Sequence, residues 1–297
     1  MRWSRWGRGR GYAARVLSVE RWPELSEPLM VVALSGWVDA GGAGAGAMIA
    51  LVEQLQGVNR FGTIDISGLA DLQQTRPVAR WEGAARVIDW PEISFECGRI
   101  KGGREGAGRD LVVVRGPEPS LNWPSTAASV VEAARRLGVR QAATLGGIPA
   151  LVSHRRSAVV TASATQRSLA QELAPLRPDY AGPTGLQTVV LRALGDAGIP
   201  GCGLWVQVPQ YVSGSPSPPS IRALLARLME VYNLNLDLRA LDDRSQAYLR
   251  RVEAGLAARP DVKAVVDQID ERQEGQTGDL VAEIEQFLRS QSQGDET

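Results

Sequence analysis

The chain alternates between short apolar segments and amphipathic helical segments, and this alternation most constrains its fold. Residues 29–35 (LMVVALS) and 111–116 (LVVVRG) are continuous apolar runs, as in strands that are covered on both faces. Helical patterns follow at residues 40–56 and 123–139, and the second opens near Pro124 and ends in a glycine-containing turn. Such alternation is typical of a mostly parallel sheet with helices on both faces.

The same patterns extend through most of the chain. They predict strands at residues 63–67, 140–147, 157–163 and 202–212, an irregular β-rich stretch at residues 78–100, and a helix within residues 182–201. A chain of 297 residues is long enough to bury one large core. We therefore expect an α/β domain over residues 16–215, built as a three-layer αβα sandwich.

A Pro- and Ser-rich segment, SGSPSPPS at residues 213–220, separates this domain from a different C-terminal region. Apolar residues then recur at helical spacing, with no strand pattern. The three apolar stripes are Ile221, Leu224, Leu225, Leu228, Met229 and Tyr232; then Val262, Val265, Val266 and Ile269; then Leu280, Ile284, Phe287 and Leu288. We expect residues 216–297 to form a helical region that packs on the sandwich or on a neighbouring subunit.

Composition excludes several classes of function. The 33 basic and 33 acidic residues cancel, so no overall field draws the chain to nucleic acid or to a membrane. The basic opening, MRWSRWGRGRG, lacks the apolar core of a secretory signal, and we expect residues 1–15 to be a disordered basic tail. Cys97 and Cys202 lie far apart in the sequence, as expected for free thiols in a cytoplasmic protein.

Few residues offer catalytic or metal-binding chemistry. The sequence contains neither a phosphate-binding P-loop motif nor a nucleophile-elbow motif. His154 is the only histidine, which excludes metal sites that need two histidines. It lies beside Arg155 and Arg156 at the entry to a predicted strand, so it is either a turn residue bonded to the backbone or a functional side chain. We predict no metal, no cofactor and no catalytic residues.

A glycine-rich segment, LSGWVDAGGAGAGAM at residues 34–48, follows the first apolar run. Gly42, Gly44 and Ala47 match the spacing of a dinucleotide-binding turn, in which glycines let the backbone approach a pyrophosphate. Asp65 would then bind a ribose hydroxyl. In that motif the first glycine directly follows the strand, whereas six residues (36–41) intervene here. The match to a nucleotide site is therefore weak.

Four segments together resemble one family. They are GWVDAG (36–41), TLGGIPALVSHRR (144–156), YAGPTGLQTVVLRALGDAGIP (180–200) and GLWVQVPQYVSGSPSPPS (203–220). In this order they resemble the proteasome assembly chaperone 2 family, in its actinobacterial branch, from about residue 16 to about residue 270.

The resemblance implies a fold similar to that of the nucleoside phosphorylases, and a homo-oligomer, expected to be a trimer. Eukaryotic and archaeal members of the family bind proteasome subunits and guide the assembly of rings. The resemblance therefore implies a non-catalytic protein-binding or assembly factor. Archaeal members dock through a C-terminal tail of a hydrophobic residue, Tyr and any residue, whereas this sequence ends in GDET, so we expect no docking by that route.

The resemblance also suggests where a site would lie. Loops that follow the carboxyl ends of parallel strands gather on one edge of the sheet. The candidate residues for ligand or partner binding on that edge are Trp37, Asp39, Gly41, Gly42, Gly146, Gly147, His154, Thr184 and Gly185. In one interpretation they form a protein-binding surface, and in another they line a pocket for a nucleoside-like or phosphate-like molecule. In a third, the glycines serve only packing, while Asp39 and Thr184 cap helices.

Overall fold

The computed structural model describes residues 16–101, 108–166, 169, 173 and 182–274. The predicted basic tail at residues 1–15 and the apolar stripe within residues 280–288 lie outside these ranges.

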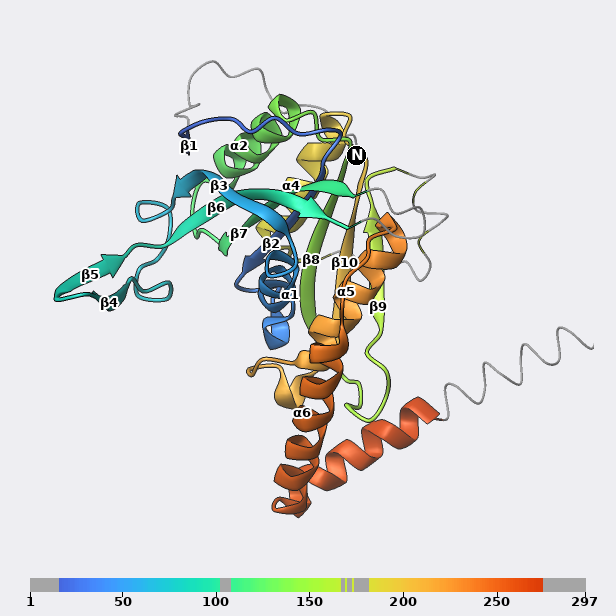
Figure 1. The fold of residues 1–297 in the computed structure, drawn as a ribbon. Coiled ribbons are helices and arrows are strands. Elements are labelled where there is room, and N and C mark those ends of the chain that lie inside the picture. Colours follow the sequence, from blue (N-terminus) through green and yellow to red (C-terminus); the bar gives the residue numbers. More distant parts are fainter. Residues whose placement is uncertain (1–15, 102–107, 167–168, 170–172, 174–181, 275–297) are drawn as a thin grey trace, which may run out of the picture.

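An eight-stranded sheet forms the middle of the molecule (Figure 1). Its strands, in spatial order, are β1 (Leu17–Val19), β3 (Gln56–Asp65), β6 (Glu92–Ile100), β7 (Arg109–Pro117), β2 (Leu29–Ser35), β8 (Gln141–Ala150), β10 (Gly201–Pro209) and β9 (Val160–Ala164). The central strands β7, β2, β8 and β10 run parallel, and β3 points the same way. Five of the eight strands therefore share one direction.

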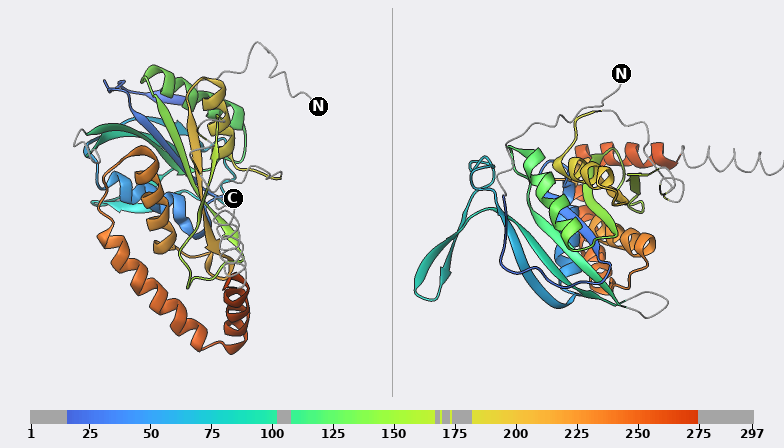
Figure 2. Two further views of the ribbon diagram at one scale, coloured as in Figure 1. Left: turned by 90° about the vertical axis from the view of Figure 1, so that its right-hand side faces the viewer. Right: turned by 90° about the horizontal axis from the view of Figure 1, so that it is seen from above.

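Helices cover both faces of the sheet (Figure 2). Helices α1 (Ala43–Val52) and α5 (Pro218–Tyr232) pack on one face, and α2 (Trp123–Arg136) and α4 (Leu186–Asp196) pack on the other. Strand β2 contributes to both cores because successive side chains of a strand point to opposite faces. Leu29, Val31 and Ala33 face α1 and α5, while Met30, Val32 and Leu34 face α2 and α4. The predicted three-layer α/β fold is confirmed.

Two elements begin at residues that the sequence pattern did not predict. The helix predicted at residues 40–56 is a short 3-10 turn, Ala40–Gly42, followed by α1. Gly41 and Gly42 have φ values of 63° and 53°, in the left-handed region, so the regular helix begins only at Ala43. Strand β3 begins at Gln56, well before the predicted strand at residues 63–67. Its first five residues are exposed, and pairing with β6 holds them in the sheet.

A two-stranded hairpin projects from the body of the molecule (Figures 1 and 2). It consists of β4 (Val78–Glu82) and β5 (Ala85–Asp89), which pair only with each other. It forms the first part of the stretch predicted as irregular and β-rich, and β6 forms the second part. Apart from the half-buried Val87, every residue of the hairpin strands is exposed.

Over residues 216–274 the C-terminal region is helical, as predicted. Helix α5 packs directly on the sheet domain, and α6 (Arg239–Ala257) leads away from it (Figure 1). A further helix over residues 260–274 turns back from the end of α6. We call α6 and residues 260–274 the helical arm. The proposed domain division at residue 216 stays a prediction. No helix within the described ranges has both the length and the apolar character needed to cross a bilayer.

Candidate functional site

The carboxyl ends of β2, β7, β8 and β10 point to one edge of the sheet, which faces the helical arm. Four loops follow these ends, at residues 36–42, 118–122, 151–159 and 210–217. We call this edge the carboxyl rim. All of the predicted site residues lie in these loops, at the end of β8 or at the entry to α4. The structure therefore brings to one rim segments that are far apart in the sequence.

The loop after β2 is joined to its neighbours by backbone hydrogen bonds. The N–H of Gly147 donates to the carbonyl oxygen of Val38 at 2.9 Å. On the other side, the N–H of Gly41 donates to Ser213 at 2.7 Å, and the N–H of Ser217 donates to Gly41 at 2.8 Å. These bonds hold the loop after β2 between the end of β8 and the segment that leads into α5.

The rim glycines allow backbones to touch. A Cβ atom on Gly147 would lie 2.3 Å from the carbonyl oxygen of Ala40, and one on Gly146 would lie 2.7 Å from that of Val38. A Cβ atom on Gly185 would lie 2.8 Å from a methyl group of Val38. Because real Cβ contacts are longer than this, a larger residue at any of these three positions would force its neighbours to shift. The space beside each of them is already filled by protein atoms, as in the packing interpretation.

Asp39 binds the beginning of α1. Its Oδ1 accepts hydrogen bonds from the N–H groups of Gly44, at 2.7 Å, and Ala45, at 3.4 Å. These N–H groups have no partner inside the helix, so the carboxylate acts as a helix cap. Burial raises the pKa of Asp39 because it disfavours the charged form, and the two hydrogen bonds only partly oppose this shift.

Thr184 does not cap α4, contrary to the expectation from the sequence. Its side chain is exposed, and the residue before the helix is Gly185. Instead, Oε1 of Glu118 accepts a hydrogen bond from the N–H of Leu186. Sequence reasoning missed Glu118 because the residue caps a helix that begins 68 positions later in the chain. The only local signal was a lone acid directly after a buried strand.

Three large apolar side chains of the carboxyl rim are more than half exposed. Trp37 is 60% exposed, Leu121 is 62% exposed and Leu151 is 70% exposed. The glycines around Trp37 are closely packed, so the loop that carries it has a fixed backbone. The rim therefore presents apolar side chains to solvent, and Trp37 is carried by a closely packed loop.

His154 is buried and bound on two sides. Its Nδ1 lies 2.6 Å from the hydroxyl of Tyr211, which also accepts the backbone N–H of His154 at 2.9 Å. Its Nε2 lies 3.1 Å from a carboxylate oxygen of Glu253 on α6, within ion-pair distance but outside good hydrogen-bond alignment. The pKa of His154 is lowered, mainly because burial disfavours the charged ring and despite the attraction of Glu253.

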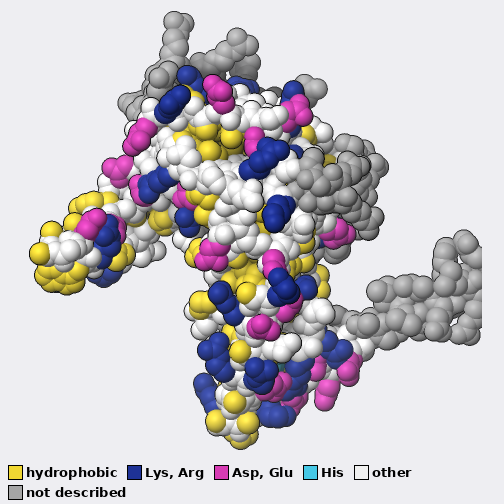
Figure 3. Space-filling model, in the orientation of Figure 1, with side chains coloured by type: hydrophobic (Ala, Val, Ile, Leu, Met, Phe, Trp, Pro, Cys, Tyr) yellow, Lys and Arg dark blue, Asp and Glu magenta, His cyan; other side chains and the backbone are white. Residues whose placement is uncertain are grey.

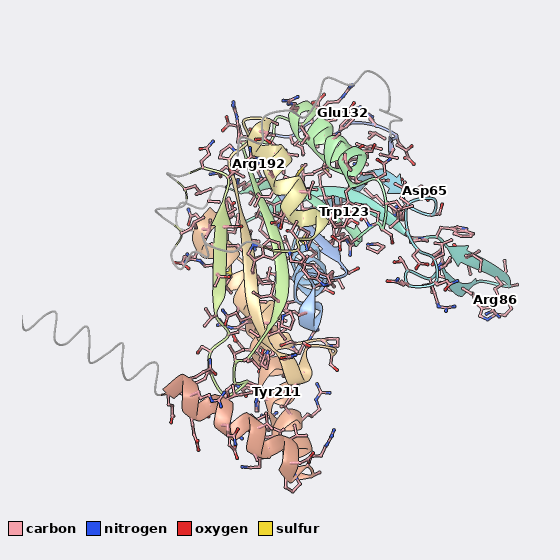
Figure 4. All side chains as sticks on the ribbon, turned by 180° about the vertical axis from the view of Figure 1, so that it is seen from behind. Asp65, Arg86, Trp123, Glu132, Arg192 and Tyr211 are labelled. Atoms are coloured by element: carbon pink, nitrogen blue, oxygen red, sulfur yellow. The ribbon has the colours of Figure 1, made fainter. Side chains whose placement is uncertain are left out.

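The two arginines after His154 bind the helical arm. Arg155 pairs with Glu253 at 2.6 Å and with Asp267 at 2.8 Å, and therefore joins α6 to the helix at residues 260–274. Arg156 pairs with Asp270 at 2.7 Å and with Glu274. Figure 4 shows Tyr211 where the sheet domain meets the arm. The HRR segment thus anchors the arm to the sheet domain.

A cavity of about 360 Å³ lies beside His154. Its walls come from the loop after β8, the end of β10, the start of α5 and the arm. The polar side chains that line it include Ser153, His154, Gln207, Ser217, Ser220 and Tyr248. The buried hydroxyl of Tyr248 lacks a well-aligned hydrogen-bond partner among the described residues, although the hydroxyl of Ser217 lies nearby. The cavity adjoins the loop after β2 through Ser217.

The structure does not have the arrangement of a dinucleotide site. Asp65 lies on β3, which is separated from β2 by β6 and β7. In a dinucleotide-binding unit the acid ends the strand next to the first one. Gly44 packs against the carbonyl oxygen of Leu145 and leaves no room there for a pyrophosphate. Within the described ranges, no three or more His, Cys, Asp and Glu side chains are placed to hold a metal ion.

Comparisons with known proteins agree with this fold. A model of the PAC2 family matches residues 33–255. A PAC2 family protein from Streptomyces avermitilis MA is 33% identical, with a TM-score of 0.72 over 76% of this chain and 95% of its own. A proteasome-assembly chaperone homologue from Mycobacterium tuberculosis is 30% identical, with a TM-score of 0.70, and the match covers 77% of this chain and 95% of the homologue. A protein of unknown function from the same species is 26% identical, with a TM-score of 0.79, and the match covers 93% of this chain and 95% of that protein. No curated protein matches the sequence.

Proposed function

The chain belongs to the PAC2 family, and on this premise we propose that it is a non-catalytic protein-binding factor that acts in proteasome assembly. The observation that carries the proposal is its similarity to the Mycobacterium tuberculosis proteasome-assembly chaperone homologue. The partner is a proteasome subunit. The buried free thiols of Cys97 and Cys202 are consistent with action in the cytoplasm.

The carboxyl rim is the surface that we assign to this partner. Exposed aromatic side chains on rigid loops are favourable binding residues, because little conformational entropy is lost when they are buried. Trp37 has this character, because the packed glycines fix the backbone beneath it, and Leu151 adds an exposed apolar side chain on the same rim. Asp39 and Glu118 contribute indirectly, since each holds the beginning of a helix beside the rim.

Binding to purified 20S proteasome α and β subunits of the source organism tests the proposal. Native mass spectrometry and pull-down should show a complex with the wild-type chain. Trp37→Ala and Leu151→Ala should weaken it at least about tenfold, as expected for central contacts of an interface. Ile49→Ser, which removes an apolar side chain that is 52% exposed on α1, is the matched control. Absence of any complex with the wild-type chain would contradict the proposal.

Self-association is part of the same proposal. We expect a homo-oligomer, and specifically a trimer, which fits the exposed apolar surfaces outside the carboxyl rim. Trp81, Val78 and Trp90 are each more than half exposed on or next to the projecting hairpin, where Figure 3 shows a group of hydrophobic side chains at the surface. Such surfaces on a folded chain commonly mark contacts with other chains.

The cavity beside His154 favours a second candidate function, the binding of a small molecule. Its volume is within the range of ligand pockets, and the hydroxyl of Tyr248 offers it an unused hydrogen bond. Arg156, the cation on its wall, is already paired with two carboxylates, which favours an uncharged, nucleoside-like ligand over a phosphate. Nucleosides, nucleotides and inorganic phosphate should be compared by thermal shift, with Tyr248→Phe as the control variant. A flat response across the panel would contradict this function.

A further inference from the structure

A shallow groove of about 480 Å³ runs along α6 on the helical arm. The residues that line it are Pro218 of α5 and Arg244, Ala247, Arg250, Arg251 and Ala254 of α6. Residues seven positions apart lie on nearly the same line of a helix, so Ala247 and Ala254 form a small apolar strip. Arg244 and Arg251 lie along one side of this strip, and Arg250 lies along the other. We call this surface the arginine groove.

The three arginines of the groove have no acidic partner in the described part of the chain. None of them pairs with a carboxylate there, whereas Arg222 on α5 pairs with Asp242 at 2.7 Å. Asp243 lies on the same side of α6, one turn before Ala247, so three arginines stand against one acid. Figure 3 shows basic side chains along this part of the molecule. The groove therefore suits an anionic segment that has an apolar side.

The sequence that follows the described residues contains such a segment. Residues 279–288 read DLVAEIEQFL, and their apolar residues recur at helical spacing. This stripe consists of Leu280, Ile284, Phe287 and Leu288. On a helix, Glu283 would flank the stripe on one side and Glu285 on the other. Residues 275–297 contain five acidic residues and one basic residue. An apolar stripe between acids is complementary to an alanine strip between arginines.

The described chain ends close enough to α6 for this segment to reach the groove. Gln273 and Tyr248 of α6 line the same cavity beside the carboxyl rim, so the end of the described chain lies beside the middle of α6. From Glu274 to Leu280 an extended chain spans up to about 20 Å, whereas a helix with its side chains is about 10–12 Å across. The glycines of the intervening GQTG, residues 275–278, favour a turn.

We propose that residues 279–288 form a helix that docks in the arginine groove of the same chain. The stripe packs on Ala247 and Ala254, while Glu283 and Glu285 meet the arginines on the two sides. The lengths agree, because the segment as a helix and the groove from Arg244 to Ala254 each span about 15 Å. The docked segment adds a third helix to the arm and covers its cationic surface. This inference does not rest on the proposed protein partner.

Amide hydrogen exchange of the full chain tests the docking. A helix of this length is marginal in water on its own, so protection of its amides requires a contact. In the wild type, residues 280–288 should exchange at least about tenfold more slowly than a free peptide of the same sequence. The double variant Arg250→Glu, Arg251→Glu removes the attraction, and Phe287→Gln removes the largest side chain of the stripe. Each should make this exchange at least about fivefold faster.

Two substitutions outside the contact are the matched controls. Arg259→Glu reverses a charge beyond the end of α6, and Ala282→Gln introduces a glutamine on the opposite side of the segment. Both should leave the exchange of residues 280–288 unchanged. Exchange in β2 should be the same in every variant, which shows that the sheet domain is folded.

Disulfide trapping distinguishes docking within one chain from docking between copies. Ala247→Cys combined with Ile284→Cys should form a disulfide on mild oxidation, whereas Ala247→Cys combined with Ala282→Cys should not. Both native cysteines are buried. When unlabelled and ¹⁵N-labelled chains are mixed in urea and refolded together, the cross-linked peptides should carry one label or the other, never both.

Three results would overturn the inference. They are residues 280–288 that exchange like the free peptide, an arginine double variant that exchanges like the wild type, and disulfides that join a labelled to an unlabelled chain. Loss of proteasome-subunit binding in Trp37→Ala, with the protection of residues 280–288 intact, would concern the proposed function alone.

Discussion

The hydroxyl of Tyr211 holds both the ring and the backbone of His154, at 2.6 Å from Nδ1 and 2.9 Å from the backbone nitrogen. Tyr211 belongs to the turn after β10, and His154 belongs to the loop after β8. The contact therefore ties together the two loops that meet the helical arm, and on its other side the ring faces Glu253 of α6. The only histidine of the chain thus lies at the junction of the arm and the sheet domain.

We predict that His154 makes the stability of the fold depend on pH. Burial lowers the pKa of His154 in the folded state below its unfolded value. The folded state then binds fewer protons than the unfolded state. The contribution of the neutral His154 ring to the free energy of unfolding is therefore fully present above roughly pH 6.5, and it is lost as the pH falls below that value. The free energy of unfolding in urea should be measured at pH 7.5 and at pH 5.5 for both proteins. From pH 7.5 to pH 5.5 it should fall more for the wild type than for His154→Gln. Equal losses would contradict the prediction. The carboxylates of Glu253, Asp267 and Asp270 have lowered pKa values and titrate below this window.

We predict that Arg155 anchors the helical arm. Arg155→Ala removes the ion pairs of Arg155 with Glu253 of α6 and with Asp267 and Asp270 of the helix at residues 260–274. Amide hydrogen exchange in residues 260–274 should become roughly fivefold faster or more, while exchange in β2 stays unchanged. Arg239→Ala is the control, because Arg239 pairs with Asp237 at an exposed site where ion pairs contribute little. Unchanged exchange in the arm of Arg155→Ala would show that other contacts hold it.

We predict opposite outcomes for two substitutions of Asp39. Asp39→Ala removes the acceptor for the N–H of Gly44 and should cost about 1 kcal/mol of unfolding free energy, as for loss of a helix cap. Asp39→Asn keeps an acceptor and carries no charge to desolvate. Because burial raises the pKa of Asp39, the neutral variant should be at least as stable as wild type at pH 7. Chemical denaturation of the three proteins at pH 7 measures both effects, and a loss in Asp39→Asn equal to that in Asp39→Ala would contradict them.

We predict that two glycine substitutions change stability in opposite directions. Gly147→Ala places a Cβ atom 2.3 Å from the carbonyl oxygen of Ala40 and should cost roughly 1–3 kcal/mol, as overpacking does. Gly255 lies exposed within α6, and a Cβ atom there meets no atom within 4 Å. Gly255→Ala should therefore stabilise the chain by about 0.5–1 kcal/mol. The same unfolding experiment compares them, and a neutral Gly147→Ala would show that the loop after β2 can shift.

The apolar runs of the sequence were sufficient to predict the layered fold. Strand β2 is apolar at six consecutive positions, 29–34, and only a strand covered on both faces accommodates this. The exposed start of β3 and the break at Gly41 and Gly42 were not predictable in the same way. Pairing with β6 decides the first, and contacts of Gly41 with Ser217 and Val208 constrain the second.

For the candidate site, the sequence by itself determined which residue types were present: a single histidine, few acids near the glycines, and glycines after several strands. Tertiary structure alone decided what they contact. Glu118 caps a helix 68 residues away, and Glu253 meets His154 across 99 positions of the chain. Local sequence patterns indicate which face of a helix or strand is apolar, because that face is set by residues close together in the sequence. These patterns do not indicate which distant helix or strand packs on that face, because this contact depends on how the whole chain folds.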